Sequence, residues 1–210
     1  SETLKKNPDV SMETLLETLT IEDICITADV LRPVYEKGNG LDGLVTLAVS
    51  PQFANDTAHL VSEAKRLWKM LSRPNILIQI PATPEGIPAI EALISENINV
   101  NATLIFSLTH YEAVVRAYLK GLSHCGAPQK IVSVASLSIS RVDTAVDRAL
   151  EAVGTPKALG IRGKVAIANA RKIYRNFQKI FYGEPFLKFK KEGARVQRPL
   201  FASAPAKNPG

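Results

Sequence analysis

The stretch NILIQIPATPEG, residues 75–86, decides the fold of this chain. Apolar residues surround one long polar side chain, Gln79, and the run ends at Pro84, Glu85 and Gly86, which break the pattern. A short apolar run of this kind predicts a strand buried on both faces, as in a parallel sheet covered by helices. Burying an unpaired amide costs about 1–3 kcal/mol, so Gln79 is expected to face something polar. In a closed barrel, that polar region is the site at the carboxyl end of the strands.

Strands and helices alternate on both sides of this run. Further strands are predicted at 44–50, 98–107, 131–140 and 196–203, and helices at 11–36, 54–72, 84–96, 108–122, 141–153 and 163–182. Ser11 is expected to cap the first helix, which Pro33 is expected to kink or end, with a further break near Thr20. This alternation predicts an α/β fold with a parallel sheet and helical crossovers. The spacing fits either a (β/α)8 barrel or a doubly wound sheet, and five strands are too few to close the barrel.

Size and composition are those of one average soluble domain. The chain has 210 residues, of which 46% are hydrophobic and 22% charged. We expect a single domain over residues 1–203 and a loose C-terminal tail over 204–210. No apolar stretch approaches the roughly 20 residues that span a bilayer, and no secretory signal opens the sequence. Two cysteines, Cys25 and Cys125, form neither a disulfide framework nor a metal site, which favours a reducing compartment, the cytoplasm or an organelle interior.

Positive charge is concentrated near the end of the chain. Residues 157–198 carry twelve Lys or Arg and two Asp or Glu, whereas the whole chain has a net charge of +6. Such a segment is typical of a polyanion-binding surface. It has no RNA-binding motif, and Tyr174, Phe177, Phe181 and Phe186 fit the apolar face of a helix. A solvated helix face is therefore favoured over a nucleic-acid partner.

Several stretches of the sequence resemble the transaldolase family. They occur in the same order and at similar spacing as in bacterial and plant transaldolases, and they are DGLVTLAVSP (42–51), NILIQIPATPEGIPAIEALISENINVNATLIFS (75–107), VASLSISRVD (134–143), RGKVAIANA (162–170) and RVQRPLFAS (195–203). The resemblance implies a partial (β/α)8 TIM barrel comprising the third to seventh strands, with the other strands absent from these residues. It also implies transfer of a dihydroxyacetone unit between phosphorylated sugars through a lysine Schiff base, without a metal or organic cofactor.

Two positions depart from the family pattern where its chemistry takes place. The Schiff-base lysine of the family motif corresponds to Gln79, and the acid/base glutamate corresponds to Ala48. An amide nitrogen is not nucleophilic and a methyl group holds no proton, so neither residue supports the family's reaction. Lys157 and Lys164 are the nearest candidate replacements in sequence, but both fall in or beside a predicted outer helix.

Four other positions match the family's substrate pocket. The resemblance implies that Asn101 and Thr103 touch substrate hydroxyls and the catalytic water, and that Ser136 and Arg141 hold the sugar phosphate. The plainer alternatives are polar filler in a strand for Asn101 and Thr103, and an ion pair with Asp143 or contact with solvent for Arg141.

Three functions remain open from the sequence. We favour a transaldolase-like protein that has lost catalysis and has a binding or structural role, within an assembly whose partner chain completes or covers the open edges of the barrel. The second is an active transaldolase of the pentose phosphate pathway, represented here by a fragment or an engineered variant. The third is a polyanion-binding module built on residues 157–198. Weak sugar-phosphate binding is compatible with the first and second.

Overall fold

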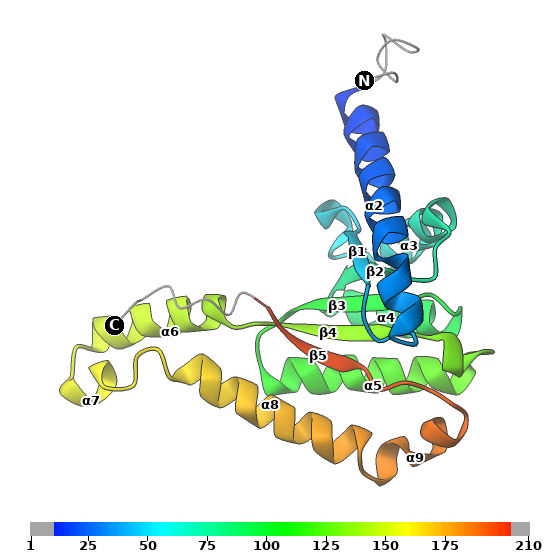
Figure 1. Ribbon diagram of the computed structural model, residues 1–210. Coiled ribbons are helices and arrows are strands. Elements are labelled where there is room, and N and C mark those ends of the chain that lie inside the picture. The colour runs from blue at the N-terminus through cyan, green and yellow to red at the C-terminus, as the bar shows by residue number, and fades with distance from the viewer. Residues whose placement is uncertain (1–10, 203–210) are drawn as a thin grey trace.

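The computed structural model describes residues 11–202. Figure 1 shows one parallel sheet with helices along it and a long N-terminal helix that projects away from it. In chain order the elements are α2 (Met12–Lys37), β1 (Val45–Ala48), α3 (Thr57–Leu71), β2 (Ile76–Pro81), α4 (Gly86–Ser95), β3 (Val100–Ile105), α5 (Leu108–His124), β4 (Ser133–Ser138), α6 (Ser140–Val153), α7 (Pro156–Leu159), α8 (Val165–Phe181), α9 (Glu184–Lys191) and β5 (Arg198–Ala202), with short 3-10 turns at Pro51–Phe53 and Pro128–Lys130.

The order of the strands identifies the architecture. The sheet runs β1-β2-β3-β4-β5, and every neighbouring pair is parallel. A doubly wound sheet reverses its strand order at a switch point, whereas a barrel adds each strand beside the preceding one. The sequential order therefore excludes the doubly wound alternative and confirms the predicted partial (β/α)8 barrel.

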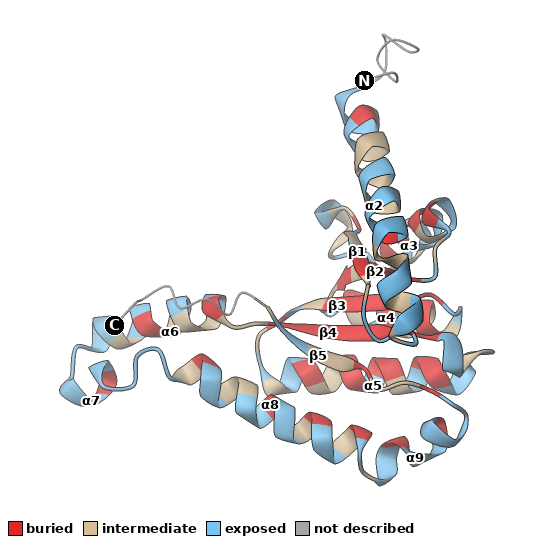
Figure 2. Cartoon of the chain, in the orientation of Figure 1, coloured by how far each residue is buried: buried red, intermediate tan, exposed pale blue. Residues whose placement is uncertain are grey.

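The two faces of the sheet have different surroundings. On β2, Ile76, Ile78 and Ile80 belong to the main core under the helices, and Leu77 belongs to a smaller cluster on the other, inner face. All four side chains are fully buried, which confirms the prediction from the apolar run. In Figure 2 the buried colour continues along β3 and β4. Gln79 is half-buried and lies on the inner face beside polar residues.

The end of the opening motif is shaped by Thr83 and Gly86. The Thr83 hydroxyl accepts a hydrogen bond from the Gly86 N–H at 2.9 Å and donates one to the Ala54 carbonyl at 2.6 Å. A Cβ at position 86 would overlap the carbonyl oxygen of Pro81, so only glycine fits. The motif thus turns the chain sharply from β2 into α4, and this turn leaves the carboxyl end of β2 open on the inner face.

Helix α2 is continuous, contrary to part of the sequence prediction. The Ser11 side chain caps it by accepting from the Thr14 N–H, as predicted. No break occurs near Thr20, whose hydroxyl instead donates to the Leu16 carbonyl one turn earlier. Pro33 lies inside the helix, which ends only at Lys37.

The connection from β4 to β5 contains two helices that the sequence reading missed, α7 and α9. Phe186, assigned from the sequence to the same helical face as Phe177 and Phe181, belongs to α9. Its ring lies 5.0 Å from that of Phe181, centroid to centroid, so the two helices share one aromatic core. The signals for α9 were Pro185 in its first turn and two phenylalanines three residues apart.

No helix within residues 11–202 combines the length and apolar character needed to cross a bilayer. The predicted tail over 204–210 and the predicted domain end at 203 lie outside the described residues.

Candidate functional site

A pocket of about 300 Å³ opens on the inner face of the sheet, at the carboxyl ends of its strands. Four strands and the start of α6 contribute its walls, which are formed by Gln79, Asn101, Thr103, Leu104, Ser136, Ser138, Arg141, Leu200 and Ala202. Five of the six residues predicted to mark the site therefore come together in one place. This is the end of a β/α barrel at which binding and catalytic groups gather.

Ala48, Gln79 and Asn101 lie side by side across three strands. The parallel register pairs Ala48 of β1 with Gln79 of β2, and Gln79 with Asn101 of β3. Ala48 is exposed and does not line the pocket, so it is the one predicted position outside the pocket wall. Its neighbour in the register is nevertheless Gln79, so a longer side chain at position 48 would start beside the Gln79 amide.

Asn101 is held in place by Ser136. The Ser136 hydroxyl donates a 2.8 Å hydrogen bond to Oδ1 of Asn101, and both side chains are buried. Because its oxygen already accepts this hydrogen bond, the NH2 group of the Asn101 amide is the donor available to a ligand. The Thr103 hydroxyl makes only a long contact, 3.4 Å, to the Ile80 carbonyl and is half-buried in the pocket wall.

Arg141 is the only charged residue among the described residues that line this pocket. It is exposed and lies in the first turn of α6, a 14-residue helix that begins at Ser140 without a side-chain cap. The predicted alternative, an ion pair with Asp143, does not form. Oδ1 of Asp143 instead accepts from the Ala166 N–H at the start of α8, at 3.0 Å. Arg141 therefore offers a charged donor for an anion at the pocket wall, in the first turn of a helix that has no side-chain cap.

No lysine, aspartate or glutamate contributes to the described wall of the pocket. Lys157 is exposed on α7, and Lys164 is exposed before α8 with its Nζ donating to the Gly160 carbonyl at 2.8 Å. Neither of the two candidate replacement nucleophiles lines the site. Across residues 11–202, no group of three or more His, Cys, Asp or Glu side chains is arranged to hold a metal ion.

Leu104 is a site residue that sequence reasoning missed. Its φ is +59°, in the left-handed region that leucine rarely adopts, and the register of β3 with β4 shifts between Ala102 and Ile105. The result is a β-bulge that brings Leu104 to the pocket. Nothing in the local sequence, which lacks glycine and asparagine at this point, signals the bulge.

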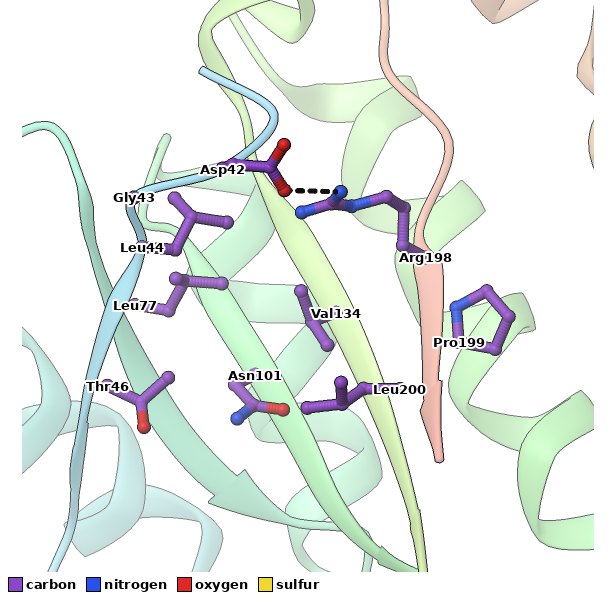
Figure 3. A pocket seen from close by; sticks show the side chains of 10 residues that line it. All are labelled: Asp42, Gly43, Leu44, Thr46, Leu77, Asn101, Val134, Arg198, Pro199 and Leu200. Atoms are coloured by element: carbon purple, nitrogen blue, oxygen red, sulfur yellow. Dashed lines mark hydrogen bonds and ion pairs between the residues drawn. The ribbon is translucent and has the colours of Figure 1, made fainter. Parts of the chain in front are cut away.

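A second cavity, of about 370 Å³, continues toward the amino ends of the strands and shares Asn101 and Leu200 with the first. Figure 3 shows its apolar walls, with Leu44 and Leu77 opposite Val134. Arg198 of β5 crosses its far end, where its Nη1 lies 3.3 Å from Oδ1 of Asp42 and its Nη2 donates to the Leu41 carbonyl. This contact joins the last strand to the segment before the first.

The basic residues of the segment 157–198 lie largely on the outside of the molecule. Seven of them on α8 and α9 are exposed and have no carboxylate within ion-pair distance among the described residues, namely Arg171, Lys172, Arg175, Lys179, Lys188, Lys190 and Lys191. This agrees with a solvated helix face. Tyr174, assigned from the sequence to the apolar face of α8, is 44% exposed.

Comparison with known proteins identifies related sequences. Residues 1–195 match the family model described as transaldolase/fructose-6-phosphate aldolase. Proteins named transaldolase are 48% identical over 204 residues in Thermobifida fusca, 46% over 202 in Mycolicibacterium smegmatis and 43% over 214 in Mycobacterium ulcerans. The alignments cover 95%, 94% and 100% of this chain and 55%, 54% and 57% of those relatives. The chain thus spans about half the length of the relatives that it matches.

Proposed function

This chain belongs to the transaldolase/fructose-6-phosphate aldolase family, and on that premise we propose that it binds sugar phosphates without forming a Schiff base. One observation carries the proposal: the pocket at the carboxyl end of the strands has Gln79 in its wall and contains no lysine or carboxylate among its described residues. Among its described residues it has the polar groups of a binding site without an amine nucleophile or a carboxylate.

The chemistry of the two substituted positions supports this conclusion. Imine formation needs an unprotonated amine lone pair, whereas the lone pair of the Gln79 amide is delocalised into its carbonyl. Proton transfer through a water needs a group that exchanges protons near neutral pH, and the Ala48 methyl has none. Because a replacement nucleophile must lie within reach of the substrate carbon, the exposed Lys157 and Lys164 do not compensate.

The remaining groups suit a phosphorylated, hydroxyl-rich ligand. Arg141 presents a permanently charged guanidinium that grips phosphate oxygens in pairs, and the uncapped start of α6 adds backbone donors. Asn101, Thr103 and Ser138 offer amide and hydroxyl groups to sugar hydroxyls along the wall. The ligand is therefore expected to place its phosphate at α6 and its carbon chain over Gln79.

Absence of catalysis is tested by turnover and by trapping. Purified chain is incubated with fructose 6-phosphate and an aldose phosphate in a coupled assay, then separately treated with borohydride and examined by peptide mass spectrometry. We expect no product above the enzyme-free background and no reduced adduct. An adduct on any lysine would overturn the proposal in favour of an active enzyme.

Binding is tested independently by calorimetric titration with fructose 6-phosphate and with inorganic phosphate. We expect Arg141→Ala to abolish the binding of both, because the only charged group of the pocket wall is then lost. Arg148→Ala is the matched control, since Arg148 is exposed on the same helix but does not line the pocket. Equal loss in both variants, or no binding by the unaltered chain, would contradict the proposed ligand site.

A polyanion-binding function is a second candidate, favoured by the seven exposed cations of α8 and α9. If it holds, binding of a double-stranded oligonucleotide should weaken steeply as salt rises, because each phosphate contact releases counterions. Binding that is absent, or independent of salt between 50 and 200 mM, would remove this candidate.

A further inference from the structure

Helix α2 has two apolar faces, and within residues 11–202 only one of them is covered. Ile21, Ile24 and Leu31 pack against the main core. A second apolar stripe is exposed in two parts of the 26-residue helix, at Met12 and Leu16 near its start and at Ile26, Val30 and Val34, four residues apart, further along. Ile26 and Val30 are 62% and 70% exposed. A helix with an additional exposed apolar stripe is suited to pack against a second partner.

The charge beside this stripe is negative. Helix α2 has six acidic and two basic residues. Asp23 falls within the stripe and Glu22 beside it, and neither has a cation within ion-pair distance among the described residues. The open face of α2 is therefore both apolar and acidic.

A groove of about 570 Å³ with the opposite charge lies between α8 and β5. Its walls are apolar at Ile167, Tyr174 and Phe201. Arg171 and Arg175, on successive turns of α8, also line it. Both arginines are exposed and lack a carboxylate partner in the described part of the chain. The residues of α8 that line the groove run from Ile167 to Gln178, a length of about 16 Å, or three helical turns.

No segment within residues 11–202 fills this groove. Helix α2 packs against β1 and α3, and β1 and β5 are opposite edges of the sheet. Figure 1 shows α2 projecting away from α8. Residues 203–210, SAPAKNPG, include no acidic residue and no large apolar one, so their sequence does not complement the groove.

We propose that the groove takes helix α2 of a second copy of this chain, with the apolar stripe against Ile167, Tyr174 and Phe201 and the Glu22–Asp23 pair beside Arg171 and Arg175. This contact uses two different surfaces, so it is heterologous, and each copy has one donor helix and one acceptor groove. Copies therefore add head to tail instead of stopping at a symmetric pair.

Association is measured by sedimentation equilibrium and by light scattering across a range of chain concentrations. We expect the average mass to rise with concentration from that of the 22.8 kDa chain. The helix variant Ile26→Asp/Val30→Asp and the groove variant Arg171→Glu/Arg175→Glu should each remain monomeric. All four positions are exposed, so circular dichroism and thermal unfolding should be unchanged.

Mixing the two variants is the decisive step. The helix variant retains an intact groove and the groove variant retains an intact helix, so an equimolar mixture should form a heterodimer and no larger species. Lys188→Glu/Lys190→Glu on α9 is the matched control for charge and should associate like the unaltered chain. A monomer at every concentration, association that survives in the groove variant, or a mixture that stays monomeric would each overturn the proposal. So would a groove variant whose only defect is weaker binding of an oligonucleotide.

Discussion

The Ser136 hydroxyl donates to Oδ1 of Asn101 at 2.8 Å, from β4 to the neighbouring β3 on the inner face of the sheet. Both side chains are buried, and no other side-chain hydrogen bond to Oδ1 of Asn101 forms within residues 11–202. The pair therefore fixes the orientation of an amide in the candidate site and also satisfies a buried acceptor.

Replacing Ser136 with alanine should affect both stability and binding. The buried Asn101 oxygen then loses its partner, which costs about 1–3 kcal/mol of unfolding free energy in urea titrations. Sugar-phosphate affinity should fall as well, because the amide becomes free to rotate. Ser138→Ala is the control for stability alone, since Ser138 lines the same pocket but makes no side-chain hydrogen bond in the described structure. Equal unfolding free energies of the two variants would show that the hydrogen bond from Ser136 to Asn101 does not stabilise the fold.

Returning an amine to position 79 should restore the first covalent step. In Gln79→Lys the new side chain starts from the inner face of β2, between Ala48 and Asn101 in the register. We expect borohydride and fructose 6-phosphate to give a reduced adduct located at residue 79. Thr46→Lys places a lysine on β1, where residue 46 lines the second cavity and not the candidate site, and should give none. An unmodified Gln79→Lys variant would show that the pocket does not bring the ketose carbonyl to this strand.

Much of the fold was predictable because the spacing of apolar residues distinguishes strands from helices even in short segments. The run around Gln79 predicted a buried strand, and β2 occupies Ile76–Pro81. Strand order was not predictable, since spacing alone fits both a barrel and a doubly wound sheet. Helix α9 was missed because Gly183 and Pro185 interrupt the helical pattern of apolar residues between α8 and α9. The aromatic core nevertheless continues from α8 into α9 through Phe186.

The candidate site was predictable only through resemblance to a family. Asn101, Ser136 and Arg141 are ordinary polar residues in the sequence, and their convergence depends on the register of β3 with β4 and on the start of α6 directly after β4. The bulge at Leu104 depends on a register shift between β3 and β4, and the residue types around Leu104 do not indicate this shift.

The left-handed backbone of Leu104 gives a test of that bulge. Asparagine adopts positive φ more readily than leucine, and a β-branched residue does so least. Leu104→Asn should thus remain close to the unaltered chain in unfolding free energy, and Leu104→Val should lose about 1 kcal/mol. Leu200→Val changes another exposed leucine of the same pocket, in an ordinary strand, and should cost less than about 0.5 kcal/mol. If the Asn variant proved the least stable of the three, leucine packing and not backbone strain would dominate at this position.

The ion pair between Glu63 and Arg66 within α3 should make stability depend on pH. Arg66 of α3 bonds both Glu63, at 2.7 Å, and Glu17 of α2. The hydrogen bond from Arg66 holds the pKa of Glu63 below its ordinary value of 4.5. A lowered folded-state pKa means that this stabilisation is present above pH 4.5 and is lost as pH falls below that value, when Glu63 takes up a proton.

Glu63→Gln is accordingly expected to cost about 0.2–1 kcal/mol at pH 7, the range of exposed ion pairs. Urea titrations repeated between pH 7 and pH 3 should show the difference from the unaltered chain shrinking once the pH passes below 4.5. Glu192→Gln removes a carboxylate that has no ion pair within residues 11–202, and it should leave the pH profile unchanged. A Glu63→Gln deficit that stays constant down to pH 3 would assign the effect to side-chain packing instead of charge.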